Sequence, residues 1–313
     1  MIYRVLGRTG LRVSIAGLGT GGASRLGQSY NQTRAESERV VRVALDLGVN
    51  LFDTARAYRG SEELLGSALE GVPRDRYVLT TKFSITQGDQ IHSDPEALTR
   101  QLEESLRLLR VDYVDVLQYH LVMPNVYDEV VERFHPAALR AQEAGKTRFI
   151  GITESVSADT RHEMLPKAIK SGLFDTIMVR YGILNQWAER EVLPAAQQAN
   201  IGVLVMAAVR TSLRTPEEAV RHLEQFINEG LLDMPRPDLR DPLGFERAGE
   251  PVTELTRAAY QFAAAHPAVS SVLIGTGNVE HLKKNVQDLL SPRLTEGQMA
   301  YLRRTFGGLT WNA

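Results

Sequence analysis

Four titratable side chains follow short apolar runs in the first part of this 313-residue chain: Asp53, Tyr58, Lys82 and His120. A free tyrosine has a pKa of about 10, so it handles protons poorly near pH 7 unless a nearby cation favours its ionised form. Lys82 could be that cation, and Asp53 could supply the counter-charge that keeps the lysine in position. His120 could donate a second hydrogen bond to a substrate oxygen or relay a proton to Tyr58. The set therefore predicts proton transfer to a carbonyl that develops into an alkoxide.

Each of these residues also has an ordinary structural interpretation. The acid could form a turn or cap a helix, the phenol could pack under a loop, the lysine could be solvated, and the histidine could sit satisfied at a rim. These ordinary interpretations are favoured when the residues are taken singly. Their occurrence together at the ends of consecutive predicted strands favours a shared catalytic site.

Short apolar runs bounded by turn residues alternate with helical patterns along the chain. The runs predict buried parallel strands at residues 14–19, 49–54, 77–83, 112–118, 147–153, 174–180, 201–207 and 270–276. Apolar spacings of three and four predict helices between them, including 35–48, 61–71, 94–110 and 189–200, with Ser61 expected as an N-cap. This alternation predicts one domain over residues 1–313 of the α/β class, a (β/α)8 TIM barrel, whose chemistry lies at the carboxyl ends of the strands.

A doubly wound sheet is the less favoured alternative. It usually has fewer strands and a G-x-G-x-x-G helix start after the first one. The first predicted strand instead leads into GLGTGGAS, which lacks that pattern.

Two further segments stand outside the strand and helix alternation. Residues 3–13 contain a turn signal at RTG between alternating segments, which predicts an N-terminal β-hairpin. Residues 211–251 form a long loop after the seventh strand, rich in proline, with only 216–229 predicted helical. That loop is either a lid over the site or a surface insertion.

Composition excludes several classes of partner. The chain has 36 basic and 38 acidic residues, so no basic excess exists to bind nucleic acid or an anionic membrane. It contains no cysteine, which removes disulfides and thiolate ligands, and we assign no metal site. The N-terminus lacks a signal-peptide pattern and no run of about 18 apolar residues occurs. We therefore expect a cytoplasmic location.

The sequence resembles the aldo-keto reductase family over nearly its whole length. The segments that carry the resemblance are NLFDTARAY, GSEELLGSAL, LTTK, VDVLQYH, GKTRFIGIT and VLIGTGNVEHLKKNV, in the family's order and spacing. The resemblance implies an NAD(P)-dependent oxidoreductase that moves a hydride between nicotinamide and a carbonyl or alcohol substrate such as an aldehyde, ketone or sugar. It makes Tyr58 the general acid/base, Asp53 and Lys82 the groups that tune it, and His120 the group that orients the carbonyl.

The resemblance also implies a dinucleotide stretched across the mouth of the barrel, with NADP expected and NAD as the alternative. The matching cofactor positions are Thr20, Gly21, Asp53, Thr153, Met178, Met206, Gly275, Thr276, Gly277, Asn278, His281 and Asn285. A simple strand-to-helix turn would also explain the glycines of the 275–278 block.

Several of these positions depart from the family pattern. Glu154 stands where an asparagine commonly holds the carboxamide, and an ionised carboxylate cannot donate a hydrogen bond. Met178 replaces a frequent glutamine, and Met206 replaces an aromatic residue that stacks on nicotinamide. Gly275 and His281 stand where many NADP-dependent members carry cations, so the local chemistry favours NAD.

Two other functions are compatible with the pattern. One is a regulatory nucleotide-binding subunit of the potassium-channel β type, which shares this fold and these four residues. The other is a Schiff-base aldolase, since such enzymes also use a lysine at a barrel strand end. For the reductase, the expected partner is a small-molecule carbonyl or alcohol substrate, whereas the regulatory subunit would act by binding a channel. The residues do not specify the oligomeric state.

Overall fold

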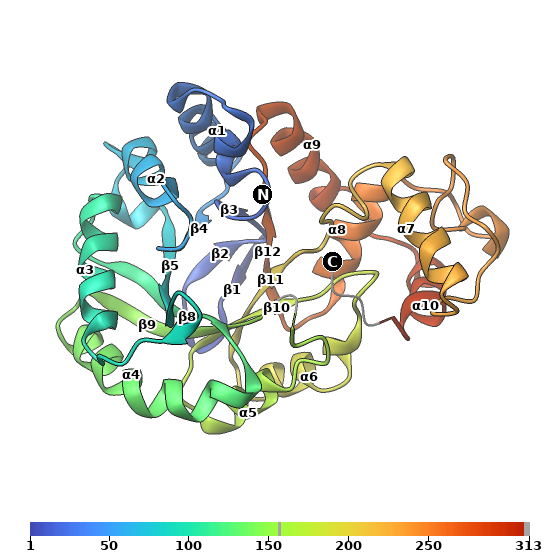
Figure 1. Cartoon of the computed structure of the whole chain (residues 1–313). Helices are drawn as coiled ribbons and strands as arrows, with labels where there is room; N and C mark the ends of the chain where they lie inside the picture. The colour runs from blue at the N-terminus through green and yellow to red at the C-terminus, as the bar shows by residue number, and fades with distance from the viewer. Residues whose placement is uncertain (156–157, 310–313) are drawn as a thin grey trace.

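The computed structural model describes residues 1–155 and 158–309 and contains a closed barrel of eight parallel strands (Figure 1). The barrel strands are β3 (Ala16–Gly19), β4 (Leu51–Asp53), β5 (Val78–Ser84), β8 (Val114–Val122), β9 (Thr147–Glu154), β10 (Thr176–Arg180), β11 (Gly202–Met206) and β12 (Val269–Ile274). The barrel closes where β12 pairs with β3, with Val272 opposite Ala16. The predicted TIM barrel is confirmed, and each barrel strand overlaps one of the eight predicted ranges.

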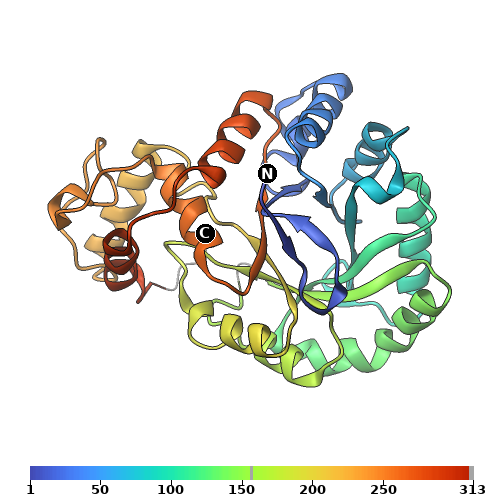
Figure 2. The same ribbon diagram turned by 180° about the vertical axis from the view of Figure 1, so that it is seen from behind.

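Helices surround the barrel in both views of the chain (Figures 1 and 2). The surrounding helices are α1 (Arg34–Asp46), α2 (Ser61–Leu69), α3 (Ala97–Leu109), α4 (Tyr127–Glu143), α5 (Met164–Ser171), α6 (Val192–Gln198), α8 (Leu255–Ala265) and α9 (Val279–Leu290). Two more, α7 (Pro216–Asn228) and α10 (Glu296–Phe306), lie outside α8. The expected cap of α2 is wrong by one residue, because Gly60 is the N-cap with φ 76°. Ser61 instead donates its hydroxyl to the carbonyl oxygen of Thr20 at 3.1 Å and ties α2 to the end of β3.

The N-terminal hairpin plugs the end of the barrel where the strands begin. Strands β1 (Tyr3–Val5) and β2 (Arg12–Ser14) pair antiparallel, as predicted. Three apolar side chains of the hairpin region join the cluster inside the barrel: Leu6, Leu11 and Val13. Gly7 approaches β11 so closely that a Cβ would lie 2.2 Å from the Gly202 nitrogen, which requires glycine there.

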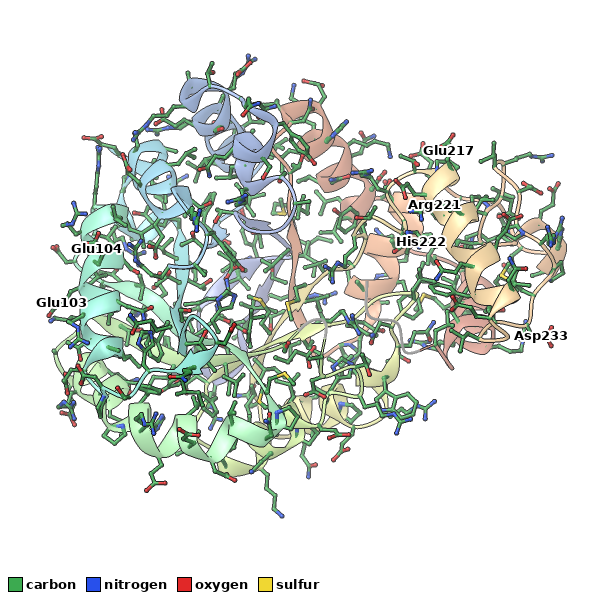
Figure 3. The ribbon with its side chains drawn as sticks, in the orientation of Figure 1. Glu103, Glu104, Glu217, Arg221, His222 and Asp233 are labelled. Carbon is green, nitrogen blue, oxygen red and sulfur yellow. The ribbon has the colours of Figure 1, made fainter. Side chains whose placement is uncertain are left out.

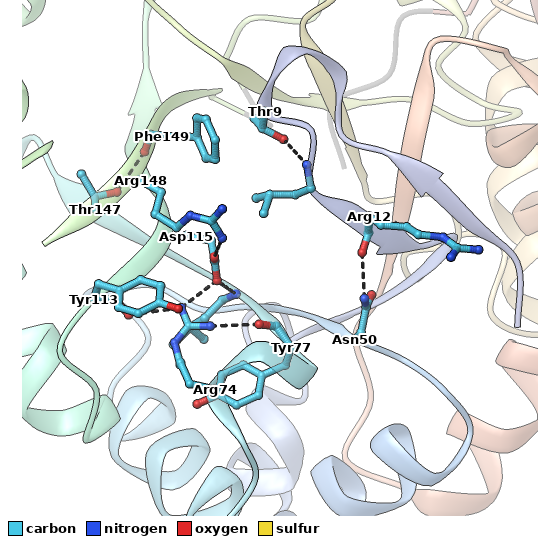
Figure 4. A network of polar contacts seen from close by, with 12 residues as sticks. Thr9, Arg12, Asn50, Arg74, Tyr77, Tyr113, Asp115, Thr147, Arg148 and Phe149 are labelled. Carbon is cyan, nitrogen blue, oxygen red and sulfur yellow. Dashed lines mark hydrogen bonds and ion pairs between the residues drawn. The ribbon is translucent and has the colours of Figure 1, made fainter. Parts of the chain in front are cut away.

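A buried carboxylate ties together the starts of three barrel strands at this same end (Figure 4). Asp115 accepts hydrogen bonds from Arg74 at 2.7 Å, from Arg148 at 2.9 Å and from the Leu79 nitrogen at 2.8 Å. The Arg74 guanidinium also lies over the Tyr113 ring, 4.1 Å from its centroid. Since chemistry belongs to the opposite end of a TIM barrel, we assign this network to stability.

The long segment after β11 lies beside the barrel. Figures 1 and 2 both show α7 next to α10, beyond α8 and away from the strands. In Figure 3, Glu217 and Arg221 on α7 mark this flank, opposite Glu103 and Glu104 on α3.

The segment also has its own packing contacts with α10. The Tyr301 hydroxyl donates to the Leu243 carbonyl at 2.9 Å, and its ring lies 5.9 Å from that of Phe245, which is fully buried. These contacts and its position make the part from α7 onward a surface insertion rather than a lid. The residues between β11 and α7 directly follow the carboxyl end of β11, and several of them line a cavity with the loop after β10.

Candidate active site

A buried ion pair lies at the carboxyl ends of two adjacent strands, β4 and β5. Lys82 Nζ lies 2.6 Å from Asp53 Oδ2, and it also donates to the Thr54 carbonyl at 2.7 Å. Lys82 is 1% exposed and Asp53 is 3% exposed. Burial of both charges is costly in water-free surroundings, so the pair depends on every hydrogen bond that it makes.

The second oxygen of Asp53 is held by two residues that our sequence reasoning missed. Asp53 Oδ1 accepts from the Thr80 hydroxyl at 2.7 Å and from Gln118 Nε2 at 3.1 Å. Both could have been found from strand periodicity, since residues two apart on a strand share a face. Thr80 precedes Lys82 by two positions, and Gln118 stands in the same relation to His120.

The tyrosine of the predicted site meets the lysine from the turn after β4. Its backbone nitrogen donates to the Ala55 carbonyl at 2.9 Å, which fixes the turn. Lys82 Nζ lies 5.0 Å from the centroid of the Tyr58 ring. The Tyr58 ring meets the His120 ring edge-on, with 5.5 Å between centroids. All four predicted residues therefore lie around one point at the mouth of the barrel.

Gly21 supports the Tyr58 ring from the loop after β3. A Cβ at this glycine would lie 2.5 Å from two ring carbons of Tyr58, closer than real contacts allow. The neighbouring Thr20 donates its hydroxyl to Thr54 Oγ1 at 2.9 Å and its backbone nitrogen to the Asp53 carbonyl at 2.9 Å. Backbone and side-chain contacts thus fix the loop against the ion pair.

Burial and neighbouring charges determine the protonation states of Lys82, Tyr58 and His120. Burial alone would lower the pKa of Lys82, but Asp53 and Tyr58 outweigh it and raise that pKa, so the ammonium stays charged. Burial raises the pKa of Tyr58, and the opposing effect of Lys82 offsets it only in part. The net direction therefore differs from our expectation of a more acidic phenol. Burial, aided by Lys82, lowers the pKa of His120 to about 3, so its imidazole is neutral near pH 7.

Three of the predicted cofactor positions lie on the strands across the mouth from Tyr58. Thr153, at the end of β9, accepts a hydrogen bond from the Leu121 nitrogen at 2.8 Å. Met178 is 2% exposed and belongs to the cluster inside the barrel. Met206 packs against that same cluster at the end of β11 and is partly exposed. Met206 therefore gives this part of the mouth an apolar surface, whereas Met178 is buried.

Glu154 does not occupy the place of a hydrogen-bond donor toward the mouth. Its carboxylate accepts from His162 Nδ1 at 2.7 Å and from the Arg180 backbone nitrogen at 2.7 Å. Glu154 is 1% exposed, and burial raises its pKa. Glu154, which departs from the family pattern, is thus part of an internal hydrogen-bond network.

The predicted 275–278 block forms the turn that starts α9. The Asn278 side chain caps this helix by accepting from the backbone nitrogens of Glu280 and His281. Gly277 contacts the loop after β3, where a Cβ would lie 2.2 Å from the Gly27 nitrogen. Gly275 and His281 are exposed, and Thr276 Oγ1 accepts from the Asn278 nitrogen at 3.1 Å. The structure therefore brings the first and last strand loops into contact.

Both lysines near this turn are already paired with acids. Lys284 donates to Asp288 at 2.8 Å and is also bonded to Glu254. Lys283 donates to Glu280 at 2.8 Å. Asn285, on the same helix, is half-buried.

Neither a metal site nor a membrane span is found in the part of the chain that the structure describes. No three His, Asp or Glu side chains within residues 1–155 and 158–309 are placed to bind a metal ion together. No helix in those ranges has the length and apolar character needed to cross a bilayer.

Comparison with known proteins agrees with the arrangement of strands and side chains. The model of the family described as Aldo/keto reductase family matches residues 17–305. The chain belongs to this family. Aldo-keto reductases are oxidoreductases, so the chain is assigned to that class of enzyme.

The aldo-keto reductase chain has curated relatives of similar length. It is 32% identical over 291 residues to L-galactose dehydrogenase of Arabidopsis thaliana, covering 90% of this chain and 86% of that protein. It is 28% identical over 312 residues to the uncharacterized oxidoreductase YqkF of Bacillus subtilis, covering 97% and 96% of the two chains.

Solved structures of aldo-keto reductases share the fold. A holo form of an enzyme from Bacillus halodurans superimposes with a TM-score of 0.72 at 24% identity, covering 97% of this chain and 96% of that one. A putative aldo-keto reductase from Pseudomonas aeruginosa gives a TM-score of 0.67 at 26% identity, covering 92% and 94%.

Proposed function

We propose that this aldo-keto reductase is an NAD(P)-dependent oxidoreductase that interconverts a carbonyl and an alcohol, with Tyr58 as the general acid/base. The observation that carries the proposal is the buried ammonium of Lys82, bonded to Asp53 at 2.6 Å and lying 5.0 Å from the Tyr58 ring centroid. A fixed cation beside a phenol stabilises the phenolate that forms when the proton leaves.

In the reducing direction, the Tyr58 hydroxyl gives its proton to the carbonyl oxygen as negative charge develops there. Its raised pKa keeps it protonated near pH 7, which suits a proton donor. Lys82, held by Asp53, then stabilises the phenolate. His120 is neutral and can donate one ring N–H to the same oxygen, which orients the carbonyl. The dinucleotide, when bound, supplies the hydride from its nicotinamide ring.

The residues at the mouth fit such a cofactor. Gly21 and Met206 are partly exposed and offer small or apolar surface on which a flat aromatic ring can lie. On the same side as Met206, Arg180 carries a buried guanidinium nitrogen that bonds to no described residue, which suits an anionic group. We propose that the dinucleotide is held by Thr20, Gly21, Asp53, Thr153, Met178, Met206, Gly275, Thr276, Gly277, Asn278, His281 and Asn285.

The choice between NADP and NAD rests on the charges near α9. Family resemblance favours NADP, whose 2′-phosphate needs Arg or Lys partners. Lys283 and Lys284 would have to leave Glu280 and Asp288 to provide them. This pairing supports NAD. Fluorescence titration with NADH and NADPH measures the two dissociation constants directly.

Sugars are the first substrates to test. The Arabidopsis relative is named for L-galactose, and the two chains match over most of their lengths. We therefore propose an aldose or a related hydroxy-aldehyde as the substrate class. Turnover with a panel of aldoses, aliphatic aldehydes and ketones tests this, and a complete lack of turnover with every member would contradict the enzymatic proposal.

Two rival functions predict different results. A Schiff-base aldolase needs a neutral lysine as nucleophile. Lys82 is instead buried in an ion pair that raises its pKa. Borohydride trapping with substrate should therefore give no adduct on Lys82. A channel-type regulatory subunit would bind the dinucleotide, turn over negligibly and assemble with a partner chain in gel filtration.

A further inference from the structure

Arg180, the last residue of β10, is a buried cation that takes no part in the proposed proton transfer. It is 3% exposed. When the Asn185 carboxamide oxygen faces it, that oxygen accepts from Arg180 Nη2 at 2.6 Å and from Nε at 3.0 Å. Arg180 Nη1 has no hydrogen-bond partner among the described residues. A buried, unpaired charged donor is costly, so a ligand that accepts from Nη1 would stabilise it.

A ring of buried groups holds this guanidinium in one orientation. In the same orientation of Asn185, its side-chain amide nitrogen donates to His162 Nε2 at 3.3 Å, and His162 Nδ1 donates to Glu154 Oε2 at 2.7 Å. The other Glu154 oxygen accepts from the Arg180 backbone nitrogen at 2.7 Å, which closes the ring. His162 is fully buried, and Asn185 is 6% exposed. Such a network preorganises the free nitrogen of Arg180 before any ligand arrives.

The guanidinium lines a small cavity between the loops that follow β10 and β11. The cavity is about 20 Å³ and is lined by Arg180, Asn185, Arg210 and Ser212, together with apolar residues of the same two loops such as Leu184 and Leu213. This volume is enough for about one water molecule or one oxygen atom of an oxyanion. It is too small for a ring, so it would take the end of an anionic group rather than a base or a sugar.

Two cations and two acids act together at this cavity, and the attraction of Glu154 on Arg180 is larger than the repulsion of Arg210. Arg210, in the loop after β11, also lines the cavity and is exposed. The pKa of Arg180 is lowered, first by burial and then by repulsion from Arg210, with Glu154 and Asp159 opposing part of this. Although Arg210 is exposed, partial desolvation lowers the pKa of its guanidinium as well. Two cations that repel each other are both stabilised by an anion placed between them.

We propose that Arg180 and Arg210 bind an oxyanion, a phosphate oxygen of the dinucleotide's diphosphate group. Arg180 pairs in register with Met206 on the adjacent strand, and Met206 is the residue proposed to lie against the nicotinamide. The diphosphate is linked to that end of the cofactor through only one ribose, so it lies within reach of Arg180. This inference rests on the proposed function, and it adds two binding residues to the proposed cofactor site.

The test is a dinucleotide titration of matched arginine variants without substrate. Fluorescence titration with NADH and NADPH should show Arg180→Met weakening binding by about tenfold to a hundredfold, the range for a lost hydrogen bond between charged groups. Arg180→Lys should recover part of that loss because it keeps the charge but not the planar fork. Arg236→Met is the control, since Arg236 lies exposed in the surface insertion, 3.8 Å from Glu224. It should bind like the wild type.

Arg210→Met provides a second test that does not disturb the buried ring. It should weaken binding several-fold, and the circular dichroism spectrum of each variant checks its folding. Inorganic diphosphate alone should compete with NADH in the wild type and lose that ability in Arg180→Met. Binding by both Met variants at the wild-type affinity would overturn the inference.

A separate measurement shows whether the bound oxyanion belongs to the dinucleotide or to the substrate. Unchanged dinucleotide affinity, together with a KM that rises for succinic semialdehyde but not for neutral butanal, would assign the site to a substrate carboxylate and overturn the diphosphate assignment. A wild-type protein that binds neither NADH nor NADPH would contradict the proposed function itself, whatever the variants do.

Discussion

Replacing Lys82 by methionine tests how strongly the buried ion pair is coupled. The variant leaves the Asp53 carboxylate 3% exposed without its cation at 2.6 Å. Removing one partner of a buried pair costs about 3–5 kcal/mol, because an uncompensated charge stays buried. Thr80 and Gln118 still donate to Asp53, so we expect the lower half of that range. Asp53→Asn should cost a similar amount, since it leaves the ammonium without its counter-charge.

The double variant Asp53→Asn/Lys82→Met removes both charges together. Its loss of stability should be smaller than the sum of the two single losses by about 1–3 kcal/mol, the coupling expected for groups in direct contact. Catalytic activity should nevertheless be lost in the two single variants and in the double variant. The double variant would then be more stable than the sum of the single losses predicts and would still be inactive. An unspecific folding defect would not produce that combination.

Urea unfolding followed by circular dichroism measures the three free energies of unfolding. The pH dependence of the free energy of unfolding gives an independent test. The folded pKa of Lys82 is raised above its ordinary value of 10.5, so its stabilisation is complete below that pH and is lost as pH rises through the folded pKa. Lys82→Met should lack this alkaline decline. Strictly additive single losses would refute the coupled pair.

Three further outcomes are expected. Gly21→Ala should lower kcat because its Cβ would overlap the Tyr58 ring at 2.5 Å, whereas Gly19→Ala, whose nearest atom is at 3.6 Å, should leave kcat near wild type. Equal kcat values for Gly21→Ala and Gly19→Ala in steady-state kinetics would exclude a role for Gly21 in packing against the Tyr58 ring. The buried neutral His120 should make stability fall between pH 6.5 and about 3, by up to about 1.4 kcal/mol per pH unit, and urea titrations of His120→Asn should show a shallower fall. Lys284→Met should leave the NADPH dissociation constant unchanged because Lys284 is paired with Asp288, and a clear weakening in fluorescence titration would show that it reaches the cofactor.

The barrel and the meeting of the four candidate residues at one end of it could be predicted because each depends on local patterns. Apolar runs of strand length separated by helical spacings specify a parallel barrel, and the topology then brings all carboxyl strand ends to one face. That is why residues as distant in sequence as Asp53 and His120 could be placed together in advance.

Other features depend on three-dimensional contacts that no spacing encodes. The Tyr58 pKa direction was missed because burial, which is invisible in the sequence, outweighs the nearby Lys82 charge. The pairing of Glu154 with His162 joins a strand end to a loop before α5, across residues with no periodic relation. The position of residues 211–251 beside α10 follows from contacts such as that of Tyr301 with Leu243.

Tyr58→Phe tests the central claim most directly, because it removes one oxygen and leaves the aromatic packing against Gly21 and His120 in place. NADH and NADPH titrations and steady-state turnover should be measured on the same preparation as the wild type. We predict unchanged dinucleotide affinity and a kcat lowered by at least about 100-fold, the contribution expected of a positioned general acid. Turnover at the wild-type rate with normal cofactor binding would contradict the account.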